Sequence, residues 1–261
     1  MSTSEGGSNI IQNGLVLCFD PANTKCFVSG STTASDLGKN STLMTFKNKV
    51  YSGGGTLDIV TVISPQYNTD NGGSVFFSGV SVLSGDAAYL PSGDTTTNFS
   101  GNVTMSVWFK KSSYNYSYVE CPVAKGYGGG SITQPYTFYL LNDSIYARLT
   151  TSTTNGYTDI SSQYSINVWN NAVLTYDGTT FSLYINGVLK ASTAKSGPIM
   201  NTTQPFNIGC QNNAGYFPST APSKTSEYFN GNISSVLLYD TALTSSEVLQ
   251  NYNALKSRFG L

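Results

Sequence analysis

Short runs of alternating apolar and polar residues, separated by turn residues, fill most of the chain and restrict it to β structure. The clearest stretch is YDGTTFSLYINGVLK at residues 176–190, which carries an Asp-Gly and an Asn-Gly dipeptide on either side of residues 179–185. Both dipeptides can adopt the positive φ angles of tight hairpin turns, so they predict three successive antiparallel strands. The middle strand alternates, which predicts one core face and one exposed face. The core face would hold Phe181, Leu183 and Ile185, and the exposed face Ser182 and Tyr184.

Comparable strand signals recur at short intervals, and helical periodicity is absent until the end of the chain. We expect strands at residues 15–19, 44–51, 57–63, 73–77, 88–90, 103–110, 118–124, 136–141, 144–150, 168–175, 180–185, 188–191, 206–208 and 231–239. The pattern predicts an all-β fold, a two-sheet antiparallel sandwich formed by a single domain, residues 14–261. The polar residues 1–13 predict a flexible N-terminal arm that orders against a neighbour.

One short C-terminal helix is expected. Thr244-Ser245-Ser246-Glu247 is a capping box, and an apolar stripe of Val248, Leu249, Tyr252 and Leu255 follows it. A helix with one apolar stripe buries that stripe against another surface. We therefore expect it to cover the sandwich or to meet a partner.

The composition excludes several classes of protein. Only 10% of the residues are charged and the net charge is −1, whereas a nucleic-acid-binding protein needs clustered Lys and Arg. The start of the chain has no signal-peptide pattern, and no stretch is apolar enough to span a bilayer, so we expect synthesis in a cytoplasm and no membrane insertion. Cys18, Cys26, Cys121 and Cys210 lack metal or redox spacing; reduced thiols are favoured over a Cys18–Cys26 bridge.

The sequence offers few residues in patterns typical of a catalytic site. The chain has no histidine, which removes the commonest general base and any histidine-bound zinc. A glycosidase needs two carboxylates across the scissile bond, and no Glu-x-Asp-x-x-Glu run occurs; Glu120 could meet Asp143, but a solvated surface carboxylate is the better interpretation. The run GYGGGS at residues 126–131 lacks the lysine of a phosphate loop and predicts a hairpin loop. We expect no enzyme.

Two sets of residues are candidates for binding. Tyr114, Tyr116 and Tyr118 alternate in YNYSY and would place three rings on one face, either to contact a glycan or partner or, as the favoured alternative, to pack within the sheet. Loop aspartates, chiefly Asp86 and Asp143, could bind calcium with backbone carbonyls. No EF-hand spacing supports a calcium site, so we expect turn aspartates and no cofactor.

The order of motifs resembles the concanavalin A-like lectin/glucanase superfamily, and more closely its laminin-G-like and pentraxin-like branch. The motifs are SVFFSG (74–79), VTMSVWFK (103–110), WNNAV (169–173), YDG (176–178), LYING (183–187), IG (208–209), FNGNI (229–233) and VLLY (236–239). The resemblance covers about residues 14 to 258 and implies a concanavalin A-like jelly-roll sandwich. Ser78 stands where relatives often carry an aspartate, and Asn170-Asn171 where they often carry two histidines. The first departure argues against a calcium site of the family type.

Two segments, one near each end of the sequence, point to a more specific group of proteins. The segments GLVLCFD (14–20) and LQNYNALKSRFG (249–260) look like those of single-domain virion proteins of tailed bacteriophages. That resemblance implies a non-enzymatic structural protein on the virion surface, as a head decoration or a tail, collar or fibre component. Its partners would be other phage virion proteins and host surface glycans, and it would be oligomeric or follow the particle's symmetry. The alternative is a lectin-like carbohydrate-binding module, with or without calcium; a glycanase is disfavoured.

Overall fold

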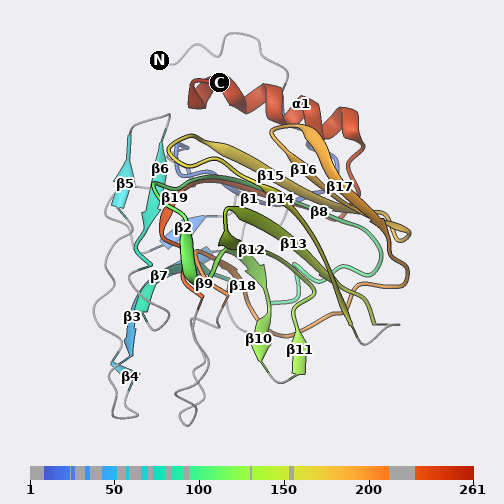
Figure 1. The fold of residues 1–261 in the computed structure, drawn as a ribbon, viewed down its shortest axis with the longest axis horizontal. Helices are drawn as coiled ribbons and strands as arrows, with labels where there is room; N and C mark the ends of the chain where they lie inside the picture. Colours follow the sequence, from blue (N-terminus) through green and yellow to red (C-terminus); the bar gives the residue numbers. More distant parts are fainter. Residues whose placement is uncertain are drawn as a thin grey trace.

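The computed structural model describes residues 9–23, 25–26, 33–35, 43–51, 57–58, 66–69, 73–79, 84–90, 94–129, 131–152, 156–211 and 227–261. Within them, two antiparallel sheets lie face to face, and a helix crosses the outer side of one sheet (Figure 1). This arrangement confirms the predicted two-sheet antiparallel sandwich with one short C-terminal helix.

The sheet beneath the helix, here sheet A, runs through seven strands in the order β17-β16-β15-β8-β19-β6-β5, and β1 also pairs with β19. Its strands are β1 (Leu15–Phe19), β5 (Gln66–Asn68), β6 (Ser74–Phe77), β8 (Val103–Lys110), β15 (Asn170–Tyr176), β16 (Thr180–Ile185), β17 (Val188–Ala194) and β19 (Gly231–Tyr239). Strands that are far apart in the sequence are neighbours in this sheet. For example, β8 lies between β15 and β19.

The opposite sheet, sheet B, has the order β14-β13-β12-β9-β18-β7-β3-β2, with β4 paired to β3. Its strands are β2 (Thr33–Ser35), β3 (Leu43–Tyr51), β4 (Leu57–Asp58), β7 (Ser84–Tyr89), β9 (Asn115–Lys125), β12 (Tyr136–Asn142), β13 (Ser144–Thr150), β14 (Tyr157–Gln163) and β18 (Phe206–Ile208). A separate hairpin, β10 (Tyr127–Gly129) and β11 (Ser131–Thr133), confirms the hairpin expected at GYGGGS.

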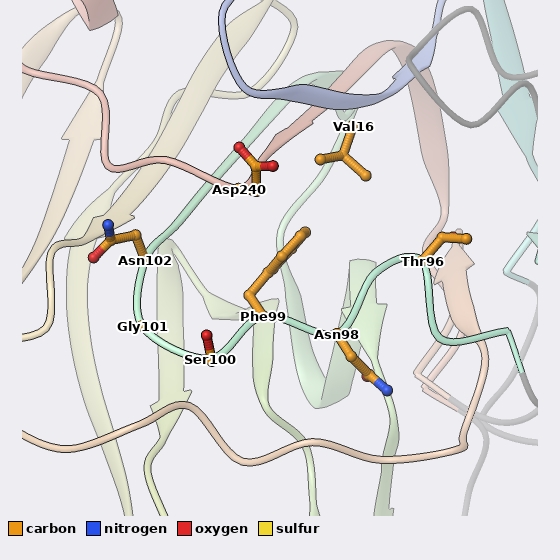
Figure 2. Close-up of a pocket in the computed structure, with 8 residues that line it drawn as sticks. All are labelled: Val16, Thr96, Asn98, Phe99, Ser100, Gly101, Asn102 and Asp240. Carbon is orange, nitrogen blue, oxygen red and sulfur yellow. The ribbon is translucent and has the colours of Figure 1, made fainter.

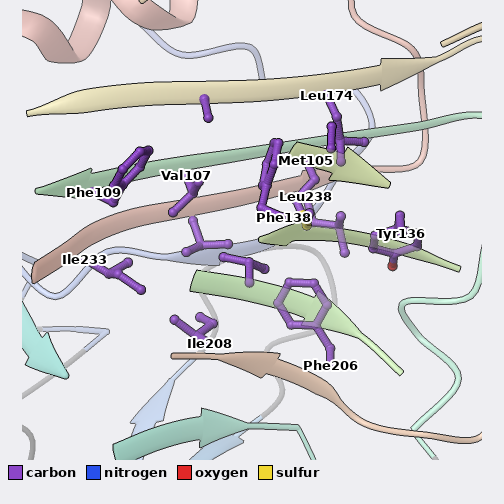
Figure 3. Close-up of a cluster of buried hydrophobic side chains, with 14 of the residues drawn as sticks. Met105, Val107, Phe109, Tyr136, Phe138, Leu174, Phe206, Ile208, Ile233 and Leu238 are labelled. Carbon is purple, nitrogen blue, oxygen red and sulfur yellow. The ribbon is translucent and has the colours of Figure 1, made fainter. Parts of the chain in front are cut away.

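The main core fills the space between the two sheets (Figure 3). Alternate residues of each strand point into it, as period-two geometry requires. Sheet A contributes Met105, Val107, Phe109, Leu174, Ile233 and Leu238, and sheet B contributes Tyr136, Phe138, Phe206 and Ile208. Phe181, Leu183 and Ile185 also lie in this core, as the sequence predicts.

The outer face of β16 is buried as well, so the prediction of an exposed face is wrong. The hydroxyl of Tyr184 lies 3.0 Å from that of Ser245 in the helix, and Ser182 is hydrogen-bonded to Ser192 on β17. Ser245 of the covering helix lies 61 residues after Tyr184 in the chain, so the local alternation cannot reveal this contact.

Helix α1 (Ser245–Lys256) begins at the predicted capping box. The Thr244 side chain accepts a hydrogen bond from the Glu247 backbone, and the Glu247 carboxylate accepts one from Thr244 N (2.8 Å). A short 3-10 helix, η2 (Ser257–Phe259), follows, and Gly260 ends it with φ of 73°. Both hydrogen bonds of the predicted capping box, between Thr244 and Glu247, are therefore confirmed.

The two turns of the opening motif use different chemistry. Asn186 and Gly187 both have positive φ, 52° and 76°, as a two-residue hairpin turn requires. In the other turn, Gly178 has positive φ (92°), and Asp177 acts through its carboxylate, which accepts hydrogen bonds from the backbone N–H groups of Thr179 and Thr180. Asp177 is thus a turn residue.

Other local expectations differ from the structure in detail. Strand β14 has no apolar alternation and was not predicted; it is fixed by pairing along the whole of β13. Of the strand expected at 57–63, residues 57–58 form β4 and residues 59–63 lie outside the described residues. All four cysteines are buried and none forms a disulfide, which confirms the favoured reading.

The described part of the N-terminal arm contacts the chain's own C-terminal region. Ile11 N donates to Asn251 Oδ1 (2.7 Å), Gln250 donates to Asn9 O (2.9 Å), and Ile10 packs beside the helix. Residues 1–8 lie outside the described residues, so the flexible arm and the domain boundary at residue 14 remain predictions.

Candidate functional site

A cavity of about 430 Å³ opens at the end of the sandwich where β8 begins and β19 ends (Figure 2). We call it the rim pocket. It is lined by Val16, Thr96, Asn98, Phe99, Ser100, Gly101, Asn102 and Asp240. Its volume falls within the roughly 300–1,000 Å³ of sites that hold small organic ligands.

The loop that forms one wall of the rim pocket is held by sheet B. Tyr136, a core residue of β12, donates its hydroxyl to Thr97 O (2.6 Å), and its ring stacks on Phe99. Lys125 donates to Asp94 O (3.3 Å), and burial lowers the pKa of Lys125 to about 8. These contacts fix the loop before any ligand arrives, which reduces the entropy lost on binding.

The described lining of the pocket is mostly polar, and Phe99 and Val16 add a smaller apolar surface. The ring of Phe99 points across the pocket toward Val16, and the Ser100 hydroxyl and the Asp240 carboxylate flank it (Figure 2). Gly101 exposes bare backbone at this point, because a Cβ built there would meet open space.

Asp240 is positioned by the first strand. Asp240 N donates to Gly14 O (2.9 Å), and Gly14 has φ of 75°, with the Asp240 carboxylate 2.8 Å from where a Cβ would stand. A glycine is needed at this contact. The Asp240 carboxylate itself is exposed and forms no hydrogen bond or ion pair within the described part of the chain. It is therefore available to a ligand.

Asn102 braces the same loop. In the orientation that satisfies its side chain, its amide nitrogen donates to Gly101 O (3.1 Å) and Asp177 O (3.2 Å). Its side chain points away from Phe99 in Figure 2. A carboxylate, a hydroxyl and a backbone turn beside an aromatic ring can bind a ligand rich in hydroxyl groups. Among the described lining residues, Asp240 supplies the carboxylate.

The predicted tyrosines lie elsewhere, at the opposite end of sheet B. Tyr114 precedes β9, donates to Tyr164 O (3.2 Å) and packs edge to face on the Tyr164 ring. Tyr116 is 71% exposed and rests edge to face on Tyr114. Tyr118 is half-buried, and burial, followed by the carboxylate of Glu120, raises its pKa. The structure thus brings Tyr114 and Tyr116 together, and contact with a glycan or partner remains a prediction for the three.

The predicted calcium residues are separated in the sheet. Asp86 lies in β7, opposite Asn48, and Asp143 lies in the turn between β12 and β13. Strands β18 and β9 stand between β7 and β12, so about 14 Å separates their backbones at three strand spacings of ~4.8 Å. Asp143 accepts hydrogen bonds from Gln163 (2.8 Å) and Ser144 (3.0 Å), which lower its pKa. Within the ranges described, no group of three metal-binding side chains gathers.

Sequence reasoning missed an aromatic cluster on the outer face of sheet B. The Arg148 guanidinium lies 3.8 Å from the ring centre of Tyr157 and 5.0 Å from that of Tyr139, and two hydrogen bonds of 2.8 Å join it to Asp159. Tyr157 is 47% exposed, so this fixed cation supports an accessible ring. The spacing of Tyr157 and Asp159 would have indicated a shared face if β14 had been recognised.

One buried glutamate, Glu120, and one partly buried glutamate, Glu227, contradict the expectation of surface carboxylates. Glu120 accepts hydrogen bonds from Lys111 and Asn230 N and does not meet Asp143. Glu227 lies beside Cys121, whose thiol donates to it (3.3 Å), and burial raises the pKa of Glu227 to about 7. Neither carboxylate lines the rim pocket.

Glu227 is expected to make stability depend on pH. Its pKa rises from 4.5 to about 7 on folding because of burial, so the folded protein holds a proton that the unfolded chain releases. The free energy of unfolding should therefore fall as pH rises from about 4.5 to about 7. Urea denaturation across this range measures the slope, which should be smaller in Glu227→Gln. Equal slopes in the two proteins would contradict the assignment.

In the part of the chain that the structure describes, no helix combines the length and apolar character needed to cross a membrane.

Residues 84–249, more than half of the chain, match a family model described as the concanavalin A-like lectin/glucanases superfamily. A search of curated proteins finds no match.

Many solved structures share the fold. The binding domain of Paraclostridial Mosquitocidal Protein 1 superposes with a TM-score of 0.63 at 16% identity, over 92% of this chain and 52% of that one. The botulinum neurotoxin serotype G binding domain gives 0.60 at 15% identity, over 91% and 50%. Domain 4 of AbnA, an extracellular arabinanase from Geobacillus stearothermophilus, solved in complex with arabinotriose, gives 0.59 at 18% identity, over 93% and 100%. This chain spans about half the length of the toxin domains, and at these identities the likeness shows the fold alone.

Proposed function

The chain belongs to the concanavalin A-like lectin/glucanases superfamily, and on that premise we propose that it is a non-catalytic module that binds carbohydrate in the rim pocket. The observation that carries the proposal is the pocket itself. It has a volume of about 430 Å³, and it brings the Asp240 carboxylate, which has no partner among the described residues, beside Phe99 and Ser100 on a loop fixed by Tyr136 and Lys125. Sugars present an apolar ring face and a rim of hydroxyls. The Phe99 edge suits the first, and Asp240 and Ser100 suit the second.

The comparisons support a binding role over a catalytic one. The similar toxin structures are binding domains, and the arabinanase domain was solved with an arabinose oligosaccharide. The lining agrees with this role, because its described residues include one carboxylate, whereas glycoside hydrolysis usually uses two.

Replacing Asp240 with alanine is expected to weaken binding of the preferred glycan about ten-fold or more, since a hydrogen bond to a charged group contributes about 1.5–3 kcal/mol. A glycan array identifies the ligand, and calorimetry on the best hit measures the loss. Asp143→Ala is the matched control, because Asp143 is an aspartate in a turn of the other sheet. Binding should be the same with calcium and with a chelator. An array without hits under both conditions, or equal affinities in the two variants, would refute the proposal.

We further propose that this module is displayed on a bacteriophage particle, where it would contact other virion proteins in an arrangement set by the particle's symmetry. This setting is supported by the sequence resemblance of the two chain ends, residues 14–20 and 249–260. Mass spectrometry of purified particles should detect the chain, and immunogold labelling should locate it on the head or the tail. Particles that lack it would refute the setting and leave the glycan proposal untouched.

A further inference from the structure

A second cavity, of about 200 Å³, lies on the outer face of sheet A at the other end of β8 and β19. We call it the lysine pocket. It is lined by Asn68, Ser74, Phe76, Lys110, Ser112, Asn167, Gly231 and Asn232. Strand β8 runs from Val103, beside the rim pocket, to Lys110; seven steps of ~3.4 Å place the two pockets about 24 Å apart. They are therefore separate sites.

Strand register builds the lysine pocket. Asn232 on β19 stands opposite Lys110 on β8 and opposite Phe76 on β6. The three form one row across the sheet, with neighbours about 4.8 Å apart. Their sequence neighbours Phe109, Val75 and Ile233 belong to the core, so period-two geometry directs Lys110, Phe76 and Asn232 to the outer face.

Several polar groups at the lysine pocket have no partner among the described residues. Lys110 forms no ion pair or side-chain hydrogen bond within the described residues, and neither does Asn232. Ser74 Oγ is buried and has no hydrogen-bond partner in the same part of the chain. A buried hydroxyl without a partner costs free energy, which is recovered when a ligand or water supplies the bond.

The lining chemistry selects the charge of the ligand. The described residues that line the lysine pocket supply amides, hydroxyls and one ammonium group, and none of these described residues is acidic. The Phe76 ring is 37% exposed and forms the apolar surface. An ammonium with no carboxylate partner among the described residues favours an anion, and an exposed ring beside amides favours the face and hydroxyls of a sugar.

We propose that the lysine pocket binds one acidic monosaccharide unit, with its anionic group on Lys110, its apolar face on Phe76 and its hydroxyls on the asparagine and serine side chains. The volume suits a single unit, since it is below the roughly 300 Å³ at which pockets for larger ligands begin. The site is independent of the rim pocket, so a glycan with both a neutral and an acidic unit could engage both ends of the sandwich.

The test is titration with sodium glucuronate, followed by backbone amide NMR. Amides of Phe76, Lys110 and Asn232 should shift in the wild-type protein, and Lys110→Met should weaken the apparent affinity about ten-fold, as loss of a charge-assisted hydrogen bond implies. Lys190→Met is the matched control, because Lys190 is exposed on the edge strand β17. It should bind glucuronate like the wild type.

Three further arms separate the alternatives. Phe76→Ala should also weaken binding, with the NMR spectrum confirming that the variant is folded. Acetate at the same concentration should give much smaller shifts; equal shifts would reduce the site to a general anion site and overturn the proposal. Asp240→Ala should keep glucuronate binding, so failure at the rim pocket and failure here are distinguishable. Unchanged affinity in Lys110→Met, or no shifts in the wild type, would also overturn it.

Discussion

Replacing Lys111 with methionine is expected to lower the free energy of unfolding by about 3–5 kcal/mol, because it leaves the carboxylate of Glu120 buried without its counter-ion. The two side chains are 3% and 2% exposed, and Nζ lies 2.5 Å from Oε2. Loss of this size should lower the melting temperature by roughly 10 °C in a chain of this length. Urea and thermal denaturation measure both quantities.

The backbone around Asn230 completes this ion pair. Lys111 Nζ donates to Asn230 O (3.0 Å), and Asn230 N donates to the second Glu120 oxygen (3.0 Å). Burial lowers the pKa of Lys111 and raises that of Glu120, and in each case it outweighs their mutual attraction. The free energy of desolvation therefore offsets much of the attraction between the two charges. The main effect of the ion pair is to fix the segment before β19 against β9.

The double variant Lys111→Met with Glu120→Leu separates these terms. It removes both charges, so most of the stability lost in the single variant should return. Lys110→Met is the control for loss of a lysine one position away, and it should change the free energy of unfolding by less than about 1 kcal/mol. If Lys111→Met behaves like Lys110→Met, the ion pair is not the stabilising element described.

The sandwich was predictable because burial on one side imposes alternation along each strand. The runs at 103–110, 144–150, 180–185 and 231–239 match the observed strands residue for residue. Strand β14 escaped prediction because it is a polar edge strand that depends on β13 for its hydrogen bonds. The local sequence pattern predicts which residues are buried, but it predicts poorly which strands pair with each other.

The candidate sites were not predictable, because each joins residues far apart in sequence. The rim pocket unites the loop at 94–102 with Asp240, and the lysine pocket unites β6, β8 and β19. Strand register, which the sequence does not state, brings Lys110, Phe76 and Asn232 together. The sequence did indicate Tyr114 and Tyr116, since a local alternation of rings needs no long-range contact.

Replacing Trp108 with alanine is expected to lower the free energy of unfolding by about 3–5 kcal/mol and to detach the C-terminal helix from sheet A. Trp108 lies on the outer face of β8 and is almost fully buried. Its ring stacks on Phe259 (4.2 Å between centres) and on Tyr252 (5.5 Å, 6° between planes). Truncation would leave a cavity between the sheet and the helix, because Trp169 packs on Phe259 from its own position and cannot fill it.

Limited proteolysis with trypsin distinguishes detachment of the helix from a general loss of stability. Cleavage after Lys256 and Arg258 should be faster in Trp108→Ala than in Lys111→Met at matched stability, since only the first variant removes the contact with Phe259. Leu249→Ala is the control on the helix itself; Leu249 is exposed, so its truncation should leave both stability and cleavage nearly unchanged. Equal cleavage in Trp108→Ala and Lys111→Met would show that the helix unfolds with the sandwich as one unit.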